Sequence, residues 1–537
     1  MNKKANLILL VPLFFIAFLF LRDKEIHIPF LDKKKPNLIV VQMEAFQSFV
    51  LEKDINGKEI TPNLNALIKD GVYFPNFYLQ NGAGSTSDAE FMFNTSLYPL
   101  KPPLVATTGA SLQEFNSLPR LLKDEGYKAL TFHTNRAVFW NRKELYSALG
   151  FDKYYDKKDF EEKDVMAFGS SDEVLYEGTA KILGKQDEPF YAHVISMSGH
   201  YPFVLPSKLR TFDLPENYKG TMVGDYVEAA HYADAALGQF IQDLKDAGKW
   251  DNTIFAVYGD HRGIEPVFQN KKDEQAMKNL LGRKYDEVDA LKVPFIIHAP
   301  NLKAEKIERV GGHLDMMPTI ASLLDVSLNK KEVFGQNLFE NNTHVVGERG
   351  HYAPEGTFVA EGKYFNPETK TVIDIKTHQK ETGDIKKYQK IEKELLNRFK
   401  ESDNVIAGLP LKKESFGREL TVTEKTMLYT EPNEKSRTNQ TIPANTTVDS
   451  FDSKAGNWYS IKLNKKEYWI KIKNPILEGW SFVKVKGEIP LYKEPNKKEK
   501  PVMTVKSQNL FVSEEWIGKG WYRVFTWAGK DLWAKVE

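Results

Sequence analysis

Residues 81–90 combine a glycine-rich turn with a hydroxyl side chain at the start of an expected helix. Gly82 and Gly84 let the backbone approach a ligand closely. The unpaired N–H groups of a helix start, together with the helix dipole, favour an anion such as a phosphate ester. Thr86 is therefore the candidate nucleophile. A glycine turn is a weak signal by itself, and an ordinary capped helix is the alternative.

Acidic and histidine side chains follow several of the strand-like apolar runs. Glu44 ends the first run, His133 ends another, and Ser198-Gly199-His200 and Asp260-His261 follow two more. Open α/β sheets bind ligands at the carboxyl ends of their strands. We therefore expect these side chains to meet at one edge of a sheet.

Glu44, Asp260 and His261 form a candidate metal site. Two carboxylates and an imidazole suit Mn²⁺, Mg²⁺ or Zn²⁺. A metal beside Thr86 would lower the pKa of its hydroxyl and neutralise the transferred group. The leaving alcohol also needs a proton donor, for which His200 and His313 are both candidates.

The elements that must position these residues alternate along the chain. Strands are expected at residues 37–43, 129–133, 190–197, 253–258 and 294–298. Helices are expected from Thr61-Pro62 to about Gly71 and at residues 117–125, 226–247 and 316–324. This alternation predicts an α/β sandwich around a largely parallel sheet.

Composition bounds the class of protein. The chain has 537 residues, which is enough for two or three domains. Its 74 basic and 73 acidic residues balance, so nothing in the overall charge indicates a nucleic-acid partner, and we expect none. The chain has no cysteine, which excludes disulfides, thiol nucleophiles and cysteine-ligated zinc.

The first 30 residues have the pattern of a membrane anchor. Lys3 and Lys4 precede an apolar run at residues 7–21, and Arg22 begins a charged segment. No small-residue cleavage site follows the run. We expect an uncleaved single-pass helix with the residues from about 30 onward outside the cell; a cleaved signal peptide is the alternative.

Six motifs in order resemble the lipoteichoic acid synthase group of sulfatase-like enzymes, within the alkaline phosphatase superfamily. The resemblance covers roughly residues 36–400. The motifs are Gln42-Met43-Glu44-Ala45-Phe46-Gln47-Ser48-Phe49, Gly84-Ser85-Thr86-Ser87-Asp88-Ala89-Glu90, Phe139-Trp140-Asn141-Arg142, Ser198-Gly199-His200-Tyr201-Pro202-Phe203, Tyr258-Gly259-Asp260-His261 and Gly312-His313-Leu314-Asp315-Met316-Met317-Pro318-Thr319.

The resemblance implies glycerol-phosphate transfer from phosphatidylglycerol through a phosphothreonine-type intermediate, with Mn²⁺. It implies that Thr86 is the nucleophile and also a metal ligand, together with Glu44, Asp260 and His261. It further implies that the glycerol-phosphate group contacts four residues: His133, Trp140, Arg142 and His200. An arginine is a good charge-assisted donor to phosphate.

The chain also departs from this group. It has one candidate membrane helix where the synthases have several, Ser85 stands where a basic residue is expected, and Asn135 stands where an acid is expected. These differences concern the lipid substrate and polymerising activity more than the phosphotransfer chemistry. The Cys/Ser-x-Pro-x-Arg motif of true sulfatases is absent.

The chain changes character after about residue 374. Residues 374–403 are rich in Lys, Glu and Gln and predict a charged helix that closes a catalytic domain at 36–403. Leu428-Tyr429-Thr430-Glu431-Pro432-Asn433 then returns as Leu491-Tyr492-Lys493-Glu494-Pro495-Asn496. This repetition predicts two small all-β units, at 419–474 and 475–537. They resemble bacterial SH3-like and GW cell-wall-binding modules.

Three functions remain open. The first is a membrane-anchored, extracellular phosphoglycerol transferase acting on phosphatidylglycerol or a related envelope phosphodiester, with the repeats binding a cell-wall polymer. The second is a metal-dependent phosphatase or phosphodiesterase with water as the acceptor, and the third is an inactive wall-binding relative. The repeats are expected to act as an independent tether that leaves the turnover of a small substrate unchanged.

Overall fold

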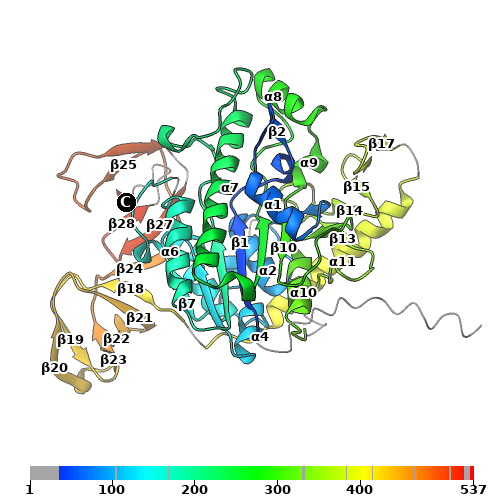
Figure 1. Ribbon diagram of the computed structural model, residues 1–537. Helices are drawn as coiled ribbons and strands as arrows, with labels where there is room; N and C mark the ends of the chain where they lie inside the picture. Colours follow the sequence, from blue (N-terminus) through cyan, green and yellow to red (C-terminus); the bar gives the residue numbers. More distant parts are fainter. Residues whose placement is uncertain are drawn as a thin grey trace, which may run out of the picture.

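The computed structural model describes residues 35–102, 106–166, 168–328, 333–381, 384–413, 415–464, 466–506, 509–524 and 532–536. The expected membrane helix at residues 7–21 lies outside these ranges. Within them, no helix combines the length and the apolar character that crossing a membrane requires. Figure 1 shows a large α/β region, with the last strands of the chain on one side of it.

An eight-stranded sheet forms the centre of the α/β region, in the order β11-β4-β10-β9-β1-β8-β6-β7. Its strands are β1 (Asn37–Met43), β4 (Val72–Tyr73), β6 (Lys128–Phe132), β7 (Lys153–Tyr155), β8 (Phe190–Ile195), β9 (Thr253–Gly259), β10 (Phe295–His298) and β11 (Glu305–Lys306). Five neighbouring strands from β9 to β7 are parallel, whereas β10 is antiparallel to both β9 and β4. The sheet is therefore mixed: most of its strand pairs are parallel, as expected, and β10 is the exception.

Helices cover both faces of this sheet because β1 is apolar on both faces. Leu38 and Val40 belong to one hydrophobic core, and Ile39 and Val41 belong to the other. The first core includes side chains of α2, α4, α5 and α10, and the second includes side chains of α1, α6, α7 and α8. The helices are α1 (Pro62–Asp70), α2 (Thr86–Thr95), α3 (Ala106–Gly109), α4 (Leu118–Asp124), α5 (Arg142–Leu149), α6 (Asp172–Gly184), α7 (Met222–Asp246), α8 (Lys271–Leu281), α9 (Glu287–Leu291) and α10 (His313–Leu323).

A second sheet and a long helix complete the α/β region (Figure 1). The antiparallel sheet consists of β13 (Val345–Gly347), β14 (Phe358–Ala360), β15 (Lys363–Asn366), β16 (Thr371–Asp374) and β17 (Lys380–Glu381). The helix α11 (Lys386–Gly408) packs its Leu395 and Phe399 into the first core. The charged helix therefore exists, but it begins at Lys386, after the β16–β17 strand pair. Two short pairs remain, β2 (Asp54–Ile55) with β3 (Lys58–Glu59) and β5 (Phe77–Tyr78) with β12 (Gly311–Gly312).

The C-terminal region is all-β and has the same strand order in its two halves. The first half is β18-β21-β22-β23-β19-β20, the second is β24-β27-β28-β29-β25-β26, and pairing of β18 with β24 joins them. The strands are β18 (Arg418–Thr421), β19 (Thr426–Tyr429), β20 (Arg437–Ile442), β21 (Thr447–Lys454), β22 (Trp458–Leu463), β23 (Lys466–Lys471), β24 (Ile476–Lys484), β25 (Glu488–Tyr492), β26 (Met503–Lys506), β27 (Asn509–Trp516), β28 (Trp521–Val524) and β29 (Leu532–Lys535).

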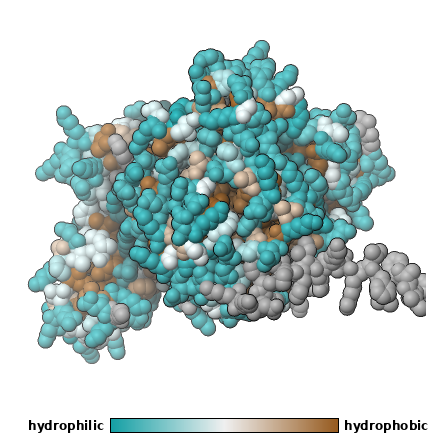
Figure 2. Space-filling view, viewed as in Figure 1, coloured by the Kyte–Doolittle hydropathy of each residue, from teal (hydrophilic) through white to brown (hydrophobic). Residues whose placement is uncertain are grey.

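Each half has a core of its own, built around Leu428 and Ile461 in the first and around Leu491 and Val512 in the second. Most of the face seen in Figure 2 is hydrophilic, and hydrophobic atoms are visible over the C-terminal strands at its lower left. Small cores of this kind leave more apolar surface near solvent than the large α/β core does.

Candidate active site

Thr86 is the first residue of α2, and its position is set by a tight turn. A Cβ atom on Gly84 would lie 2.4 Å from a carboxylate oxygen of Asp88, whose other oxygen accepts a hydrogen bond of 2.9 Å from the Gly84 N–H. Ser85 has a φ of 42°, a conformation that costs a non-glycine residue free energy. Every residue of α2 is buried, so the packed helix holds this turn in place.

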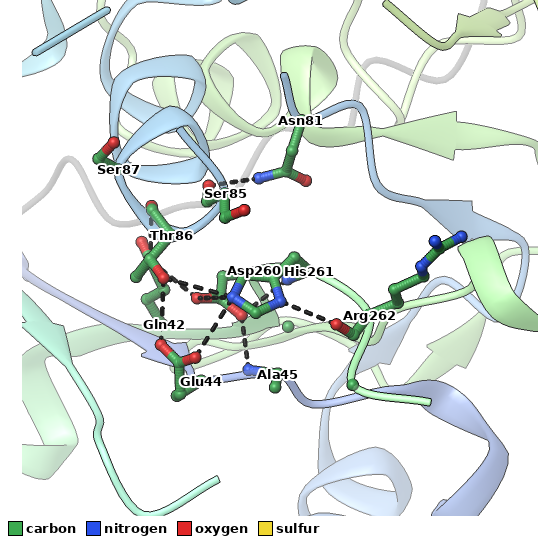
Figure 3. A network of polar contacts seen from close by, with 12 residues as sticks. Gln42, Glu44, Ala45, Asn81, Ser85, Thr86, Ser87, Asp260, His261 and Arg262 are labelled. Atoms are coloured by element: carbon green, nitrogen blue, oxygen red, sulfur yellow. Dashed lines mark hydrogen bonds and ion pairs between the residues drawn. The ribbon is translucent and has the colours of Figure 1, made fainter. Parts of the chain in front are cut away.

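The ends of β1 and β9 bring the three expected metal ligands to Thr86 (Figure 3). The Thr86 hydroxyl lies 3.2 Å from Glu44 Oε2 and 3.3 Å from His261 Nε2. His261 Nε2 lies 3.3 Å from Glu44 Oε1 and 3.7 Å from Asp260 Oδ2. These four side chains therefore converge on one point.

Hydrogen bonds from backbone and amide groups hold the side chains of Asp260 and His261 in place. The N–H groups of Ala45 and His261 both donate to Asp260 Oδ1, each at 2.7 Å. Gln42 Nε2 donates to Asp260 Oδ2 at 3.4 Å and to the Thr86 carbonyl at 3.1 Å. His261 Nδ1 donates to the Arg262 carbonyl at 2.9 Å, so Nε2 is the ring nitrogen that faces Glu44 and Thr86 and that would bind a metal after losing its proton.

The closely packed charges of the cluster shift the pKa values of Glu44 and Asp260. Burial by itself would raise the pKa of Glu44, but the charge of His261 and its hydrogen bond lower it to about 2. Burial raises the pKa of Asp260 to about 7, against the opposing attraction of His261. Glu44 is thus ionised at neutral pH, and a further positive charge placed beside Asp260 would favour its ionised form.

The donor set fits a divalent metal ion. The ligand atoms of Glu44, Asp260 and His261 lie within 4.8 Å of one another, and the Thr86 hydroxyl supplies a fourth oxygen. Carboxylate and hydroxyl oxygens with one imidazole suit Mn²⁺, Mg²⁺ or Zn²⁺.

A second acidic group of this kind, Asp286, Asp289 and His378, has other partners. Arg283 donates to both oxygens of Asp289, and Asp286 accepts from His378 and caps α9. This cluster therefore has a structural explanation.

Arg142 lies beside the cluster with one nitrogen available to a ligand. The side chain is 1% exposed, and Glu90 accepts from its Nε at 3.0 Å and from its Nη2 at 2.6 Å. Within the part of the chain that the structure describes, its buried Nη1 has no hydrogen-bond partner. Because Arg142 lines the pocket at Thr86, this guanidinium is placed to bind a phosphate oxygen.

His133 is neutral and presents an acceptor to the same pocket. Its Nδ1 donates to the Ile195 carbonyl at 2.9 Å, because a carbonyl can only accept. Burial, reinforced by the charge of Arg142, lowers the pKa of His133 to about 3. Its Nε2 therefore carries a lone pair at neutral pH and suits a substrate hydroxyl better than a phosphate oxygen.

These side chains share one pocket of about 240 Å³. Trp140 lines it from η2 (Phe139–Asn141), where Trp140 and Asn141 both have positive φ. His200 lines it from the loop after β8, with Nδ1 donating to the Tyr201 carbonyl at 2.8 Å. The complete lining is Glu44, Ser85, Thr86, His133, Asn135, Phe139, Trp140, Arg142, Phe168, Met197, His200, His261 and Phe511.

His313, the other candidate proton donor, is not in this pocket. It is fully buried at the start of α10, where Nε2 donates to the Gly259 carbonyl at 2.9 Å and Nδ1 accepts from the Gln80 N–H at 3.4 Å. Since both ring nitrogens are engaged away from Thr86, the candidacy of His313 as proton donor was wrong, and of the two candidate donors it is His200 that lines the pocket.

Gln42, Tyr352 and Phe511 are three of the site residues that received no role from the sequence. Gln42 links Asp260 to the backbone of Thr86. Tyr352 lies over His261, with ring centroids 6.1 Å apart, and its hydroxyl is 2.9 Å from the Ser85 hydroxyl. Phe511 comes from β27 and lines the pocket, which contradicts the expectation of an independent C-terminal tether. Only Gln42 lies in a motif that could have signalled a role.

The sequence has known relatives. Residues 36–326 match the family model described as Sulfatase. Lipoteichoic acid synthase 2 of Bacillus subtilis (strain 168) is 34% identical over 373 residues, which are 67% of this chain and 56% of that protein. Lipoteichoic acid synthase of Staphylococcus aureus (strain USA300) is 35% identical over 387 residues, 70% of this chain and 57% of that one. The match thus spans little more than half the length of these curated relatives.

Solved structures show the same fold. The crystal structure of the lipoteichoic acid synthase LtaP from Listeria monocytogenes is 36% identical with a TM-score of 0.66, and the match covers 71% of this chain and 94% of that one. A protein in the alkaline phosphatase superfamily from Vibrio parahaemolyticus is 22% identical with a TM-score of 0.56, and the match covers 70% of this chain and 89% of that one. The second likeness concerns the fold alone.

Proposed function

Since the chain belongs to the sulfatase family, and its relatives include lipoteichoic acid synthases, we propose that it is a metal-dependent phosphoglycerol transferase. The observation that carries this proposal is the placement of the Thr86 hydroxyl, 3.2 Å from Glu44 and in one pocket with the buried Arg142. The donor we propose is phosphatidylglycerol or a related envelope phosphodiester.

The reaction has two displacement steps. Thr86 Oγ, as the alkoxide that forms when its hydroxyl proton passes to solvent, attacks the phosphorus of the donor. The bond from phosphorus to the leaving alcohol breaks, and His200 gives that alcohol a proton. The acceptor alcohol then attacks the phosphothreonine, gives its proton to His200 and releases Thr86 as the alkoxide. Arg142 binds a phosphate oxygen, and His133 Nε2 and Trp140 contact the glycerol portion.

Glu44, Asp260, His261 and Thr86 would hold the metal ion, for which we propose Mn²⁺, with Mg²⁺ or Zn²⁺ as substitutes. When bound, it lowers the pKa of the threonine hydroxyl and neutralises charge on the transferred group. Gln42 and the backbone N–H groups at Asp260 keep the carboxylates in place.

We also propose a location and a domain plan. Residues 7–21 would anchor the protein in the cell membrane with residues 36–403 outside as the catalytic domain, and amino-terminal sequencing of the membrane fraction tests whether the anchor is retained. Residues 419–474 and 475–537 would be two SH3-like or GW repeats that bind a cell-wall polymer. The equal strand order of the two halves supports this division.

The test is to incubate the protein with Mn²⁺ and phosphatidylglycerol and to follow diacylglycerol and the carrier of the glycerol phosphate. Transfer to an alcohol, together with a glycerol-phosphate adduct on the Thr86 peptide in mass spectrometry, supports the transferase. Release of free glycerol phosphate alone would instead identify a phosphodiesterase with water as the acceptor. Thr86→Ala should abolish both products. If the variant still formed both of them, the role of Thr86 would be refuted.

A further inference from the structure

The pocket at Thr86 has a polar end and an aromatic rim. Phe139 and Phe168 have ring centroids 5.0 Å apart, and Phe139 and Trp140 are 6.1 Å apart. Phe511 of β27 joins these rings in the pocket lining while 39% of its surface remains exposed. The second half of the C-terminal region therefore supplies part of the pocket wall.

Ionic and polar contacts hold β27 against the α/β region. Arg136 Nη1 donates to Ser513 Oγ at 3.0 Å, and its Nη2 donates to Glu514. Ser513 is fully buried, and Arg136 and Glu514 are only 12% and 14% exposed. Desolvated, hydrogen-bonded charge pairs of this kind fix the relative orientation of two surfaces.

A second contact holds β24. Lys143 Nζ donates to Glu478 Oε2 at 2.6 Å, with exposures of 17% and 5%, and the same oxygen accepts from the Glu419 N–H. Together with the Arg136 contact, this secures both ends of residues 136–143 against the C-terminal strands, and β24 packs against η2.

The segment held in this way is strained. Trp140 and Asn141 have φ values of 56° and 52°, and left-handed backbone is unfavourable for non-glycine residues, so it persists only where the surrounding structure holds it. Since this segment also carries Arg142, the C-terminal strands support the phosphate-binding side of the pocket as well as its rim.

We propose that Phe511 is a specificity-determining residue of the phosphotransfer site and selects phosphodiesters with an apolar group next to the phosphate. The polar end of the pocket takes the phosphate and the glycerol hydroxyls. The phenylalanine rings of the rim, Phe139, Phe168 and Phe511, offer apolar contact area, which suits the hydrocarbon next to the ester oxygen of the leaving alcohol. This inference rests on the proposed function, and it makes the second half of the C-terminal region a wall of the active site.

The test compares Phe511→Ala with Phe451→Ala in the full chain with Mn²⁺. Phe451 is a matched control because it lies on β21 of the first half, is 37% exposed and is not in the pocket lining. The substrates are two glycerol-phosphate diesters, one with a methyl and one with a hexyl leaving group. Phe511→Ala should raise KM for the hexyl diester about tenfold, as expected for one lost aromatic contact. KM for the methyl diester should stay within about twofold of the unmodified protein, and kcat should be unchanged for both diesters.

Phe511→Leu keeps apolar volume and should recover most of the affinity for the hexyl diester. Equal KM values for Phe511→Ala and Phe451→Ala with the hexyl diester would overturn the inference and leave the proposed function standing. If the unmodified protein turned over neither diester, the proposed function would fail instead. Calorimetric binding of the two diesters to the same variants would then decide the role of Phe511, since the pocket wall exists regardless of turnover.

Discussion

Glu90 accepts hydrogen bonds from two nitrogens of Arg142, at 3.0 and 2.6 Å, and a further one from the Tyr146 hydroxyl. Glu90 lies one turn after Thr86 on α2, and Arg142 begins α5. One buried helix therefore places both the proposed nucleophile and the guanidinium that we propose binds the phosphate. The ion pair fixes the orientation of the Arg142 guanidinium. Glu90 binds Nε and Nη2, and among the described residues Nη1 has no hydrogen-bond partner.

Replacing Glu90 by Gln leaves the charge of Arg142 buried without a counterion. Breaking a buried pair in this way costs about 3–5 kcal/mol, so Glu90→Gln should lower the free energy of unfolding by roughly 3 kcal/mol and raise KM. Urea unfolding and steady-state kinetics measure these effects. Glu177→Gln, which breaks an exposed pair with Lys181 on α6, is the control and should leave stability essentially unchanged, because solvent screens exposed pairs. Equal effects of the two substitutions would contradict the role of Glu90.

The sequence was sufficient to predict strands with a clear local pattern and the meeting of the candidate ligands at the ends of those strands. Residues 37–43 form β1 with the expected bounds, because a strand buried on both faces is a continuous apolar run. Glu44 and Asp260-His261 lie directly after parallel neighbours, so their meeting followed from strand adjacency. The direction of β10 was not accessible in this way, since a short apolar run has the same composition in either orientation.

Contacts between distant parts of the chain left no local signal. Arg136 and Glu514 are ordinary surface residue types, and only the docking of β27 buries them. The same holds for Phe511, because nothing in the local sequence of a predicted all-β unit links one phenylalanine to a distant pocket. The beginning of α11 was misplaced because Lys- and Glu-rich sequence suits both a solvated helix and the exposed strand β17.

Glu44→Ala should abolish stoichiometric metal binding and activity, because Glu44 contributes an ionised carboxylate next to both Thr86 and His261. In the unmodified protein, saturation with Mn²⁺ at 100 times its Kd should stabilise the fold by about 2.7 kcal/mol. Metal analysis and thermal unfolding with and without Mn²⁺ give independent readouts. Glu177→Ala, an exposed change on α6, should behave as the unmodified protein. If Glu44→Ala kept its full Mn²⁺ content and its activity, the assignment of Glu44 as a metal ligand would be refuted.

Gly199 allows the loop that carries His200 to pass against β1. A Cβ atom at this position would lie 2.1 Å from the backbone oxygen of Glu44, so Gly199→Ala must displace one of the two segments. Displacements of about 1 Å at a catalytic group reduce rates about 100-fold, and we expect a loss of kcat of that order. Gly408→Ala is the control, because nothing lies within 4 Å of its Cβ position. Full activity of Gly199→Ala would show that the loop position is not critical.

Asp172 gives folding stability a defined pH dependence. Its carboxylate is fully buried at the start of α6, where Oδ1 accepts from the Met197 and Ser198 N–H groups at 2.7 and 3.0 Å and Oδ2 is buried without a partner among the described residues. Burial raises its pKa from 3.8 to about 6. Between these values the folded state binds more protons than the unfolded state, so stability falls as the pH rises from about 4 to about 6. Two pKa units correspond to roughly 3 kcal/mol.

Asp172→Asn mimics the protonated carboxyl and should remove this slope. The variant should equal the unmodified protein in stability near pH 4 and exceed it by up to roughly 3 kcal/mol above pH 6. Urea unfolding at intervals from pH 4 to pH 7 measures the difference in stability. Subtracting one profile from the other cancels the contribution of groups common to both proteins. Asp234 is such a group, because burial raises its pKa to about 6 as well. Parallel profiles would mean that Asp172 has the same proton affinity in the folded and unfolded chains. Asp172 also accepts from the Met197 and Ser198 N–H groups, just before His200. The amide oxygen of the introduced side chain can accept the same two hydrogen bonds, so we expect Asp172→Asn to leave KM unchanged.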